Sequence, residues 1–338
     1  MRVAVDVMSG DNPAEELIKG ALSAAKDFGI EVVLIGAPEA VDRYADDGKG
    51  IYVKHAASVV TMEDNALAAI KDKDDSSVAV AAMLLKNNEA DALVSAGNTG
   101  ALISTASIRV RRVKGIRRAA IGTVVPLDKP FIIVDAGANT EVLPENLVQF
   151  AHMGSLYAER VLGISSPRVA LLSNGTEDTK GTPITKEAFS VLKESELNFI
   201  GNVEARELPA GCCDVLVCDG FTGNVTLKLI EGMGKFMSRT INSLFRHSIF
   251  TMFAYLFCKN QIKKLKKRLD AGEYGGAPLL GIAKPVIKAH GNSDAKGIYN
   301  AIRQAKIFTE SGIIKEFEDK FRRNTANESK DSNSPSAD

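Results

Sequence analysis

Short loops that combine small polar residues with a lysine are the part of this sequence best suited to chemistry, because they can bind an anion. One loop reads Asp219-Gly-Phe-Thr-Gly-Asn224, and Lys228 follows about one turn later. The apolar run 215–217 before it predicts a buried strand, and the spacing after it predicts a helix. Backbone N–H groups at a helix start favour an anion. Taken alone, this loop is better explained as an ordinary strand-to-helix turn.

Repetition of the pattern is what favours a binding site. At least five apolar runs stop at a cluster of Gly, Asn, Ser, Thr and Asp, in the loops 95–101, 135–140, 173–181, 219–224 and 290–294. Loops after the carboxyl ends of parallel strands lie along one edge of the sheet, where α/β proteins bind their ligands. The set is rich in anion donors and poor in nucleophiles, so a phosphate-bearing ligand fits it best. The candidate anion-binding residues are Gly97, Thr99, Gly100, Gly223 and Asp219, and the candidate catalytic residues are Asn98, Lys180, Asn224, Lys228 and His290.

The elements that must position these loops alternate along the chain. Strands are predicted from residue 3, at 31–35, at 53 with 57–60, and at 92–94, 131–134, 169–172, 199–201, 215–217 and 286–287. Helices are predicted at 13–25 and 64–70, then up to residues 86, 110, 160 and 193, and after residue 294. Alternation of this kind predicts parallel βαβ units and an α/β fold.

Composition excludes several classes of protein. The 338 residues are 45% hydrophobic and carry 42 Lys and Arg against 42 Asp and Glu, so there is no global bias towards nucleic acid. The charge is unevenly placed, however, with basic runs at 109–118 and 259–268. The four cysteines have no C-x-x-C spacing, which argues against zinc. Dinucleotide, P-loop and serine hydrolase motifs are absent.

Cys218 as a thiol nucleophile is a minor alternative. His290 in the loop 290–294 is explained about equally well as a site residue and as a turn residue without a role. The strand at the N-terminus leaves no room for a signal peptide, and we expect a cytoplasmic protein.

An apolar segment with basic residues after it interrupts the α/β pattern. It runs from Ile249 to Phe257, includes Phe250 and Phe253, and precedes Lys259 and the run 263–268. It is too short to cross a bilayer, so it is a buried hairpin, a dimer contact or an interfacial anchor. We expect one α/β/α catalytic domain over 1–323, with 235–272 as a projecting helical hairpin. The composition of 324–338 predicts a disordered tail.

Taken together, the motifs resemble the acyl-ACP:phosphate acyltransferase family of bacterial phospholipid synthesis over about residues 2 to 312. The resemblance rests on the runs 95–101, 137–139 with 144–145, 149–151 with 153–154, 175–177 with 180–181, 201–204, and 219–224 with 227–228. It implies a three-layer α/β/α fold with a largely parallel sheet, shared with isopropylmalate dehydrogenases and phosphate acetyltransferases. It also implies transfer of a long acyl chain from acyl carrier protein to inorganic phosphate, in a homodimer associated peripherally with the membrane.

This chain departs from the family pattern at a few positions. The first loop reads Asp6-Val-Met-Ser-Gly-Asp11, with Val7 and Ser9 where the family has Ala and Gly, and Pro13-Ala14 is swapped. Thr140-Glu141 and Ala119 also differ. A Cβ at residue 9 is unfavourable in a tight turn, so the geometry of the first loop is open.

The chemistry of this reaction needs no cofactor or metal, because phosphate is already an anionic nucleophile and a thiolate is a good leaving group. The site must then position phosphate and stabilise the oxyanion. We assign Lys180 and Lys228 to phosphate, and Asn98, Asn224 and the loop amides to oxyanion and phosphate together. His290 protonates the departing sulfur in this hypothesis. The rivals are a β-decarboxylating dehydrogenase of the same fold and a membrane-bound scaffold without activity.

Overall fold

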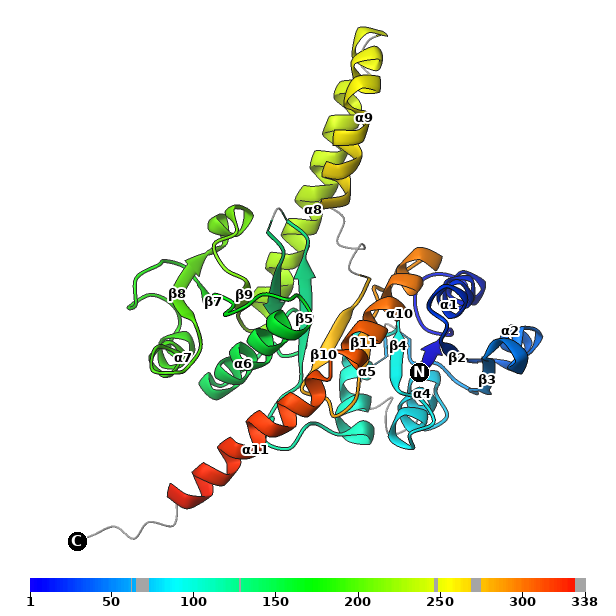
Figure 1. The fold of residues 1–338 in the computed structure, drawn as a ribbon, viewed down its shortest axis with the longest axis horizontal. Helices are drawn as coiled ribbons and strands as arrows, with labels where there is room; N and C mark the ends of the chain where they lie inside the picture. Colours follow the sequence, from blue (N-terminus) through cyan, green and yellow to red (C-terminus); the bar gives the residue numbers. More distant parts are fainter. Residues whose placement is uncertain (62, 65–72, 128, 246–248, 269–274, 332–338) are drawn as a thin grey trace. The chain divides into compact units, whose positions relative to one another are not determined.

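The computed structural model describes residues 1–61, 63–64, 73–127, 129–245, 249–268 and 275–331 (Figure 1). The chain divides into two compact units. The first unit is Met1–Gly122, Glu159–Ile164 and Gly275–Asp338, and the second is Thr123–Ala158 and Ser165–Tyr274. The single catalytic domain expected over 1–323 stays a prediction.

The first unit is built on a mostly parallel sheet. Its strands are β1 (Arg2–Asp6), β2 (Glu31–Gly36), β3 (Ile51–His55), β4 (Ala92–Ser95), β10 (Ala277–Leu280), β11 (Val286–Lys288) and the start of β5 (Ala120–Val125). Their order is β3-β2-β1-β4-β11-β10-β5, and β10 is antiparallel to both of its neighbours. Residues Val3, Ala4 and Val5 are fully buried, as expected for a strand covered by helices on both faces.

Helices cover both faces of this sheet. They are α1 (Ala14–Phe28), α2 (Pro38–Val41), α4 (Ser77–Lys86), α5 (Thr99–Thr105), α10 (Ala295–Glu310) and α11 (Ile313–Asp331), with a π-helical turn at Ala106–Val110 and 3-10 turns at Asp42–Tyr44 and Asp47–Lys49. Helix α1 packs against α10 so closely that a Cβ at Gly20 would lie 2.3 Å from the carbonyl oxygen of Ala295. Helix α4 packs against α5, on the other side of the strands in Figure 1.

The second unit has four parallel strands and the longest helix of the described chain. The strands are β6 (Phe131–Val134), β7 (Val169–Ser173), β8 (Phe199–Glu204) and β9 (Val215–Val217), in the order β6-β9-β7-β8. The helices are α6 (Pro144–Arg160), α7 (Pro183–Lys193), α8 (Gly220–Phe245) and α9 (Ile249–Arg268), with a 3-10 turn at Ala205–Ala210. A Cβ at Gly154 of α6 would lie 2.5 Å from Val215, so α6 packs tightly on β9.

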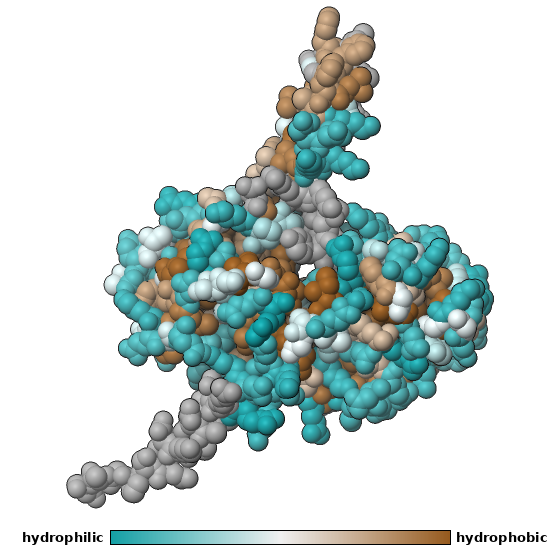
Figure 2. Space-filling model, in the orientation of Figure 1, coloured by the Kyte–Doolittle hydropathy of each residue, from teal (hydrophilic) through white to brown (hydrophobic). Residues whose placement is uncertain are grey.

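Helices α8 and α9 form the predicted hairpin, which extends beyond the strands of the second unit (Figure 1). The rings of Phe245 and Tyr255 join the two helices at a centroid distance of 5.6 Å. The far half of the hairpin is largely hydrophobic in Figure 2, and Phe250 and Phe257 are 87% and 84% exposed. None of the helices in the described part of the chain is long and apolar enough to cross a membrane.

The sequence-based elements differ from the structure in several places. Strand β3 ends at His55, and the residues 57–60 that were predicted to extend it make only an isolated bridge between Ser58 and Ser76. The backbone there binds the segment before α4 instead: Ala57 N donates to Asp75 O at 3.2 Å, Ser58 O accepts from Ser77 N at 3.0 Å, and Lys73 Nζ donates to Val59 O. Strands β5 and β10 were not predicted. The helix expected at 64–70 and the end of the tail, 332–338, lie outside the described residues, whereas α11 includes residues 324–331.

Candidate active site

Three loops of the first unit meet at the carboxyl ends of β1, β4 and β11. The amide of Asp11 donates to Gly291 O at 2.8 Å, and Ala289 N donates to Ser95 O at 2.9 Å. Gly10 has a φ of +118°, and a Cβ there would lie 3.1 Å from both Ala96 Cβ and Gly291 O. The close approach therefore requires glycine at residue 10. The structure thus brings His290 and the 97–100 turn to the same sheet edge, as predicted.

Asp6 is fully buried and holds two of these loops by hydrogen bonds. Its Oδ2 accepts from Ser95 Oγ at 2.8 Å, and its Oδ1 accepts from Met8 N at 3.2 Å. Ser95 Oγ in turn accepts from Gly97 N at 3.1 Å. The carboxylate thereby fixes the turn after β4 through one hydroxyl. Sequence reasoning missed Asp6 and Ser95 as site residues, although a polar residue that ends a buried strand is a usable signal.

Ser9, the departure in the first loop, is accommodated without backbone strain. Residue 9 is not among the described non-glycine residues with a positive φ. Its hydroxyl lies 3.4 Å from that of Ser77, and a Cβ at Gly97 would lie 2.7 Å from Ser9 Cβ. The extra carbon at residue 9 therefore fits because residue 97 is glycine.

Asn98 begins helix α5, and both ends of its amide are engaged. Its Oδ1 accepts from Ala101 N at 3.1 Å, which caps the helix. Its Nδ2 donates to Thr61 O at 3.2 Å and to Asp64 O at 3.5 Å. Thr99 and Gly100 form the first turn of α5. The amide predicted to bind an oxyanion thus already binds two backbone carbonyls.

His290 and Lys288 are the remaining residues of the cluster in the first unit, which the loops after β1, β4 and β11 form. His290 is exposed, and its Nδ1 accepts from Asn292 N at 3.4 Å. Lys288 is half-buried at the end of β11, and its Nζ donates to Ala96 O at 3.1 Å and also to Ala289 O. Lys288 was not predicted, because a lysine within an apolar run gives no motif signal.

In the second unit, Asp135 is fully buried at the end of β6 and accepts at least five hydrogen bonds. The donors are the amides of Gly137, Ala138 and Asn139 and the side chain of Asn139, at 2.7 to 3.2 Å. A carboxylate that accepts several N–H groups shapes the turn around it. Asp135 and Asn139 are also site residues that the sequence reasoning did not single out.

The Asp219 turn packs directly on this Asp135 turn. Gly220 N donates to Asn139 O at 2.7 Å, and a Cβ at Gly223 would lie 2.0 Å from Asp135 O. The Asp219 carboxylate accepts from Thr222 N at 2.8 Å and from Thr222 Oγ1 at 2.6 Å. Asp219 therefore caps α8, and its own charge occupies part of the predicted anion position. Asn224 is exposed, and a Cβ at Gly137 of the Asp135 turn would lie 3.6 Å from Asn224 Cβ. Asn224 therefore lies next to the Asp135 turn.

The two predicted lysines lie on different elements of the second unit. Lys228 is exposed on α8, and its Nζ is 3.1 Å from Glu231 Oε2. Lys180 is exposed on the loop after β7, where its N–H donates to Glu177 O at 3.0 Å. Asn202 holds this loop from β8, since its Nδ2 donates to Glu177 O at 2.9 Å. Strands β7 and β9 are neighbours, so the loop of Lys180 and the start of α8 lie at one edge, whereas Lys228 lies further along α8, which begins at Gly220.

Cys218 lies between the Asp135 and Asp219 turns but is not suited to nucleophilic attack. It is buried, its Sγ lies 3.7 Å from Asp135 O, and burial raises the pKa of its thiol well above the usual value. The thiol is therefore protonated and inaccessible at neutral pH. Among the residues that the structure describes, no group of three or more His, Cys, Asp or Glu is placed to hold a metal ion.

Comparisons with known proteins agree with one another. A family model described as "Fatty acid synthesis protein" matches residues 1–316. Relatives named "Phosphate acyltransferase" are 46% identical in Thermoanaerobacter pseudethanolicus and 45% identical in Thermoanaerobacterium thermosaccharolyticum, each alignment covering 93% of this chain and 95% of the relative. A phosphotransacetylase from Streptococcus pyogenes matches in structure with a TM-score of 0.60 at 17% identity, over 93% of this chain and 94% of that one. This likeness confirms the predicted α/β/α fold class.

Proposed function

Because this chain belongs to the phosphate acyltransferase family, and is thus an acyltransferase of lipid biosynthesis, we propose that it transfers a long-chain acyl group from acyl carrier protein to inorganic phosphate. The product, acyl phosphate, then supplies the acyl group for phosphatidic acid. The observation that carries the proposal is the extent of the match. The matched residues 1–316 include every loop of the candidate site, in the first unit and in the second.

The proposed reaction is direct attack of phosphate on the thioester. A phosphate oxygen bonds to the thioester carbon, the carbonyl oxygen becomes an oxyanion, and the C–S bond then breaks. The electron pair leaves with sulfur, and the thiolate takes a proton. Phosphate is the nucleophile, so no enzyme-bound acyl group is required. The buried, protonated Cys218 is consistent with this route.

The groups of each unit are assigned here by their own chemistry. In the second unit we assign Lys180 and Lys228 to phosphate, and Asn224 to phosphate and oxyanion. The Gly223 amide, expected to join Asn224, already donates to Asp219 O at 2.9 Å. Asp219 acts through the turn that it caps. In the first unit we assign the amides of Thr99 and Gly100 to the anion, whereas Gly97 N already donates to Ser95 Oγ. His290, exposed at the same edge, protonates the sulfur.

Asn98 takes a different role from the one expected. Its amide nitrogen donates to Thr61 O and Asp64 O, and its oxygen accepts from Ala101 N. A direct contact with an oxyanion would break one of these bonds. We therefore assign Asn98 to positioning the turn.

The proposed partners are acyl carrier protein, a second copy of the chain, and the inner surface of the cell membrane. The hairpin supports peripheral membrane association, because exposed Phe250, Phe253 and Phe257 stand next to exposed Lys259 and Lys263. Aromatic rings enter the acyl boundary of a bilayer while lysines attract anionic headgroups. The side chains of residues 266–268, which belong to the predicted basic run, lie outside the described ones.

The direct test is to incubate the purified chain with phosphate and palmitoyl-ACP, or with palmitoyl-CoA, and to trap acyl phosphate with hydroxylamine after removal of the thioester. We expect phosphate-dependent acyl phosphate with a preference for the carrier-protein donor. Thioester hydrolysis without acyl phosphate would overturn the proposal. NAD or Mg²⁺ that raised the melting temperature would favour the dehydrogenase alternative.

A further inference from the structure

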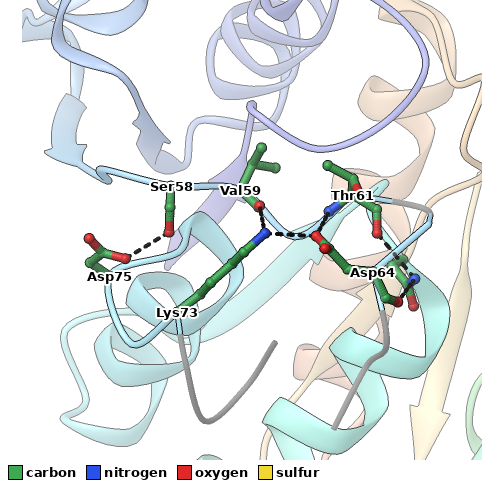
Figure 3. A network of polar contacts seen from close by, with 7 residues as sticks. Ser58, Val59, Thr61, Asp64, Lys73 and Asp75 are labelled. Carbon is green, nitrogen blue, oxygen red and sulfur yellow. Dashed lines mark hydrogen bonds and ion pairs between the residues drawn. The ribbon is translucent and has the colours of Figure 1, made fainter. Parts of the chain in front are cut away.

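A polar network holds the segment before α4 in the first unit, and Lys73 is at its centre (Figure 3). Lys73 Nζ donates to Asp64 Oδ2 at 2.8 Å and to Val59 O at 3.0 Å. The same carboxylate oxygen accepts from Thr61 N at 2.8 Å. One ammonium therefore ties together residues 59, 61 and 64.

This network has a direct connection to the turn after β4. The two carbonyls that accept from Asn98 Nδ2 belong to Thr61 and Asp64, the residues that the Lys73–Asp64 pair holds. Asn98 Oδ1 accepts from Ala101 N, so the contact continues into the first turn of α5. A displacement of Asp64 must therefore move the partners of Asn98.

The other supports of the turn come from within the sheet. Ser95 and buried Asp6 hold Gly97 N, and Lys288 holds Ala96 O. The support from Asp64 and Lys73 is different in kind, because it reaches Asn98 from a surface segment. Both side chains are about one-third exposed, at 30% and 32%. Their removal leaves the buried supports in place, so we expect a local effect and an intact fold.

We infer that Asp64 and Lys73 are positioning residues of the acyl transfer, which set the Gly97–Gly100 turn through Asn98 without touching the substrate. The inference rests on the proposed function. The hydrogen bond from Lys73, with that from Thr61 N, lowers the pKa of Asp64. The carboxylate thus stays charged at neutral pH, and the pair is formed under the conditions of the reaction.

The test compares Lys73→Met and Asp64→Asn with wild type in steady-state kinetics and in amide hydrogen exchange. We expect kcat to fall about tenfold, as for a slight misplacement of catalytic groups, while the KM for phosphate changes little. Exchange should become faster in the peptides that contain Thr61 N and Ala101 N. In the pair Lys73→Met with Asn98→Ala, the second change should add little to the first, because both act through one contact.

Two variants serve as matched controls. Ser58→Ala removes a hydrogen bond to Asp75 from the same segment, and Lys49→Met removes an exposed pair with Asp46 in the same unit. Neither reaches Asn98, so both should keep wild-type kcat and exchange at Ala101. Wild-type kcat in Lys73→Met and Asp64→Asn, or unchanged exchange at Ala101, would overturn the positioning role. Absence of acyl phosphate with the wild-type chain would instead contradict the proposed function, and the exchange measurement distinguishes the two failures.

Discussion

Lys228 Nζ lies 3.1 Å from Glu231 Oε2, one turn further along α8, and the lysine side chain is 54% exposed while that of Glu231 is 16% exposed. To bind phosphate, Lys228 must either contact the anion and the Glu231 carboxylate together or leave the carboxylate. Only the lysine of this pair is exposed, so movement of Lys228 to phosphate would take this partner from a mostly buried carboxylate. The sequence placed Lys228 in the site but gave no indication that Glu231 competes for it.

The first prediction concerns the phosphate lysines. Lys180→Ala and Lys228→Ala should each lower kcat/KM by roughly two orders of magnitude, because a charged donor in a partly dehydrated site typically contributes a few kcal/mol. The melting temperature should not change, since both side chains are exposed. Steady-state kinetics at subsaturating phosphate provide the measurement.

Lys235→Ala is the control for these variants, because Lys235 is also exposed on α8. Glu231→Gln sharpens the test, since it frees Lys228 and should lower the KM for phosphate. Near-wild-type rates in both alanine variants would mean that the lysines are merely solvated.

The second prediction concerns docking of the acidic carrier protein on the basic segment 109–118. Arg111 and Arg112 are exposed, whereas Arg109 contacts Asp74 and its side chain is only 18% exposed. Arg111→Glu with Arg112→Glu should raise the KM for acyl-ACP much more than that for acyl-CoA, because steering by charge acts on the carrier. Added salt should reduce the difference. Equal effects on both donors would place the docking surface elsewhere.

The third prediction concerns the hairpin. Phe253→Glu with Phe257→Glu should abolish binding to vesicles that contain anionic lipid, because charges replace exposed rings. Oligomeric state and activity in solution should remain those of wild type. Vesicle sedimentation and size-exclusion chromatography measure the two properties, with Val191→Glu as a control on α7, where Val191 is 51% exposed. Monomers or misfolded protein from the double variant would identify the surface as a dimer interface or core.

The fourth prediction concerns acid stability of the second unit. Burial alone would raise the pKa of Asp214, but hydrogen bonds from Arg168 outweigh it and hold that pKa below its usual value. A depressed pKa stabilises the fold above the unfolded value of about 3.9, and this stabilisation is lost as the pH falls through the lower folded value. Asp214→Asn should therefore lower the urea midpoint at pH 7, with the difference from wild type shrinking below about pH 4.

Asp178→Asn is the control, because Asp178 forms an exposed pair with Lys193 in the same unit. It should change the urea midpoint little at any pH. A difference between wild type and Asp214→Asn that persisted unchanged at low pH would show that the Arg168 pair is not the cause.

Local signals predicted much of the fold. Pro13 and the acids Glu15 and Glu16 predicted the start of α1, whereas the helix continues past its predicted end at residue 25 to Phe28, before the left-handed Gly29. Strands β5 and β10 were missed because neither is followed by a Gly- and Asn-rich loop. Residues 57–60 were assigned to a strand from their apolar side chains, but their backbone binds Lys73, Asp75 and Ser77, and no local pattern reveals those contacts.

The site was predicted less completely than the fold. Loop composition found Gly97, Asn98, Asp219, Gly223 and Asn224, which the structure places at carboxyl ends of strands. It did not find the groups that shape those loops. Buried Asp135 binds amides only two to four residues further along the chain. Buried Asp6, in contrast, acts through Ser95, which is distant in sequence, and the Asp64–Lys73 pair acts through Asn98. Such roles depend on tertiary contacts, which a single sequence does not display.

The central claim is that phosphate attacks the thioester of acyl-ACP directly. The most direct measurement mixes the chain with acyl-ACP and isotopically labelled free carrier protein, with and without phosphate, and follows acyl phosphate and exchange of the carrier. Direct attack predicts acyl phosphate and carrier exchange only when phosphate is present, in wild type and in Cys218→Ala alike. Exchange without phosphate would reveal an acyl-enzyme, and absence of acyl phosphate when phosphate is present would contradict the activity itself.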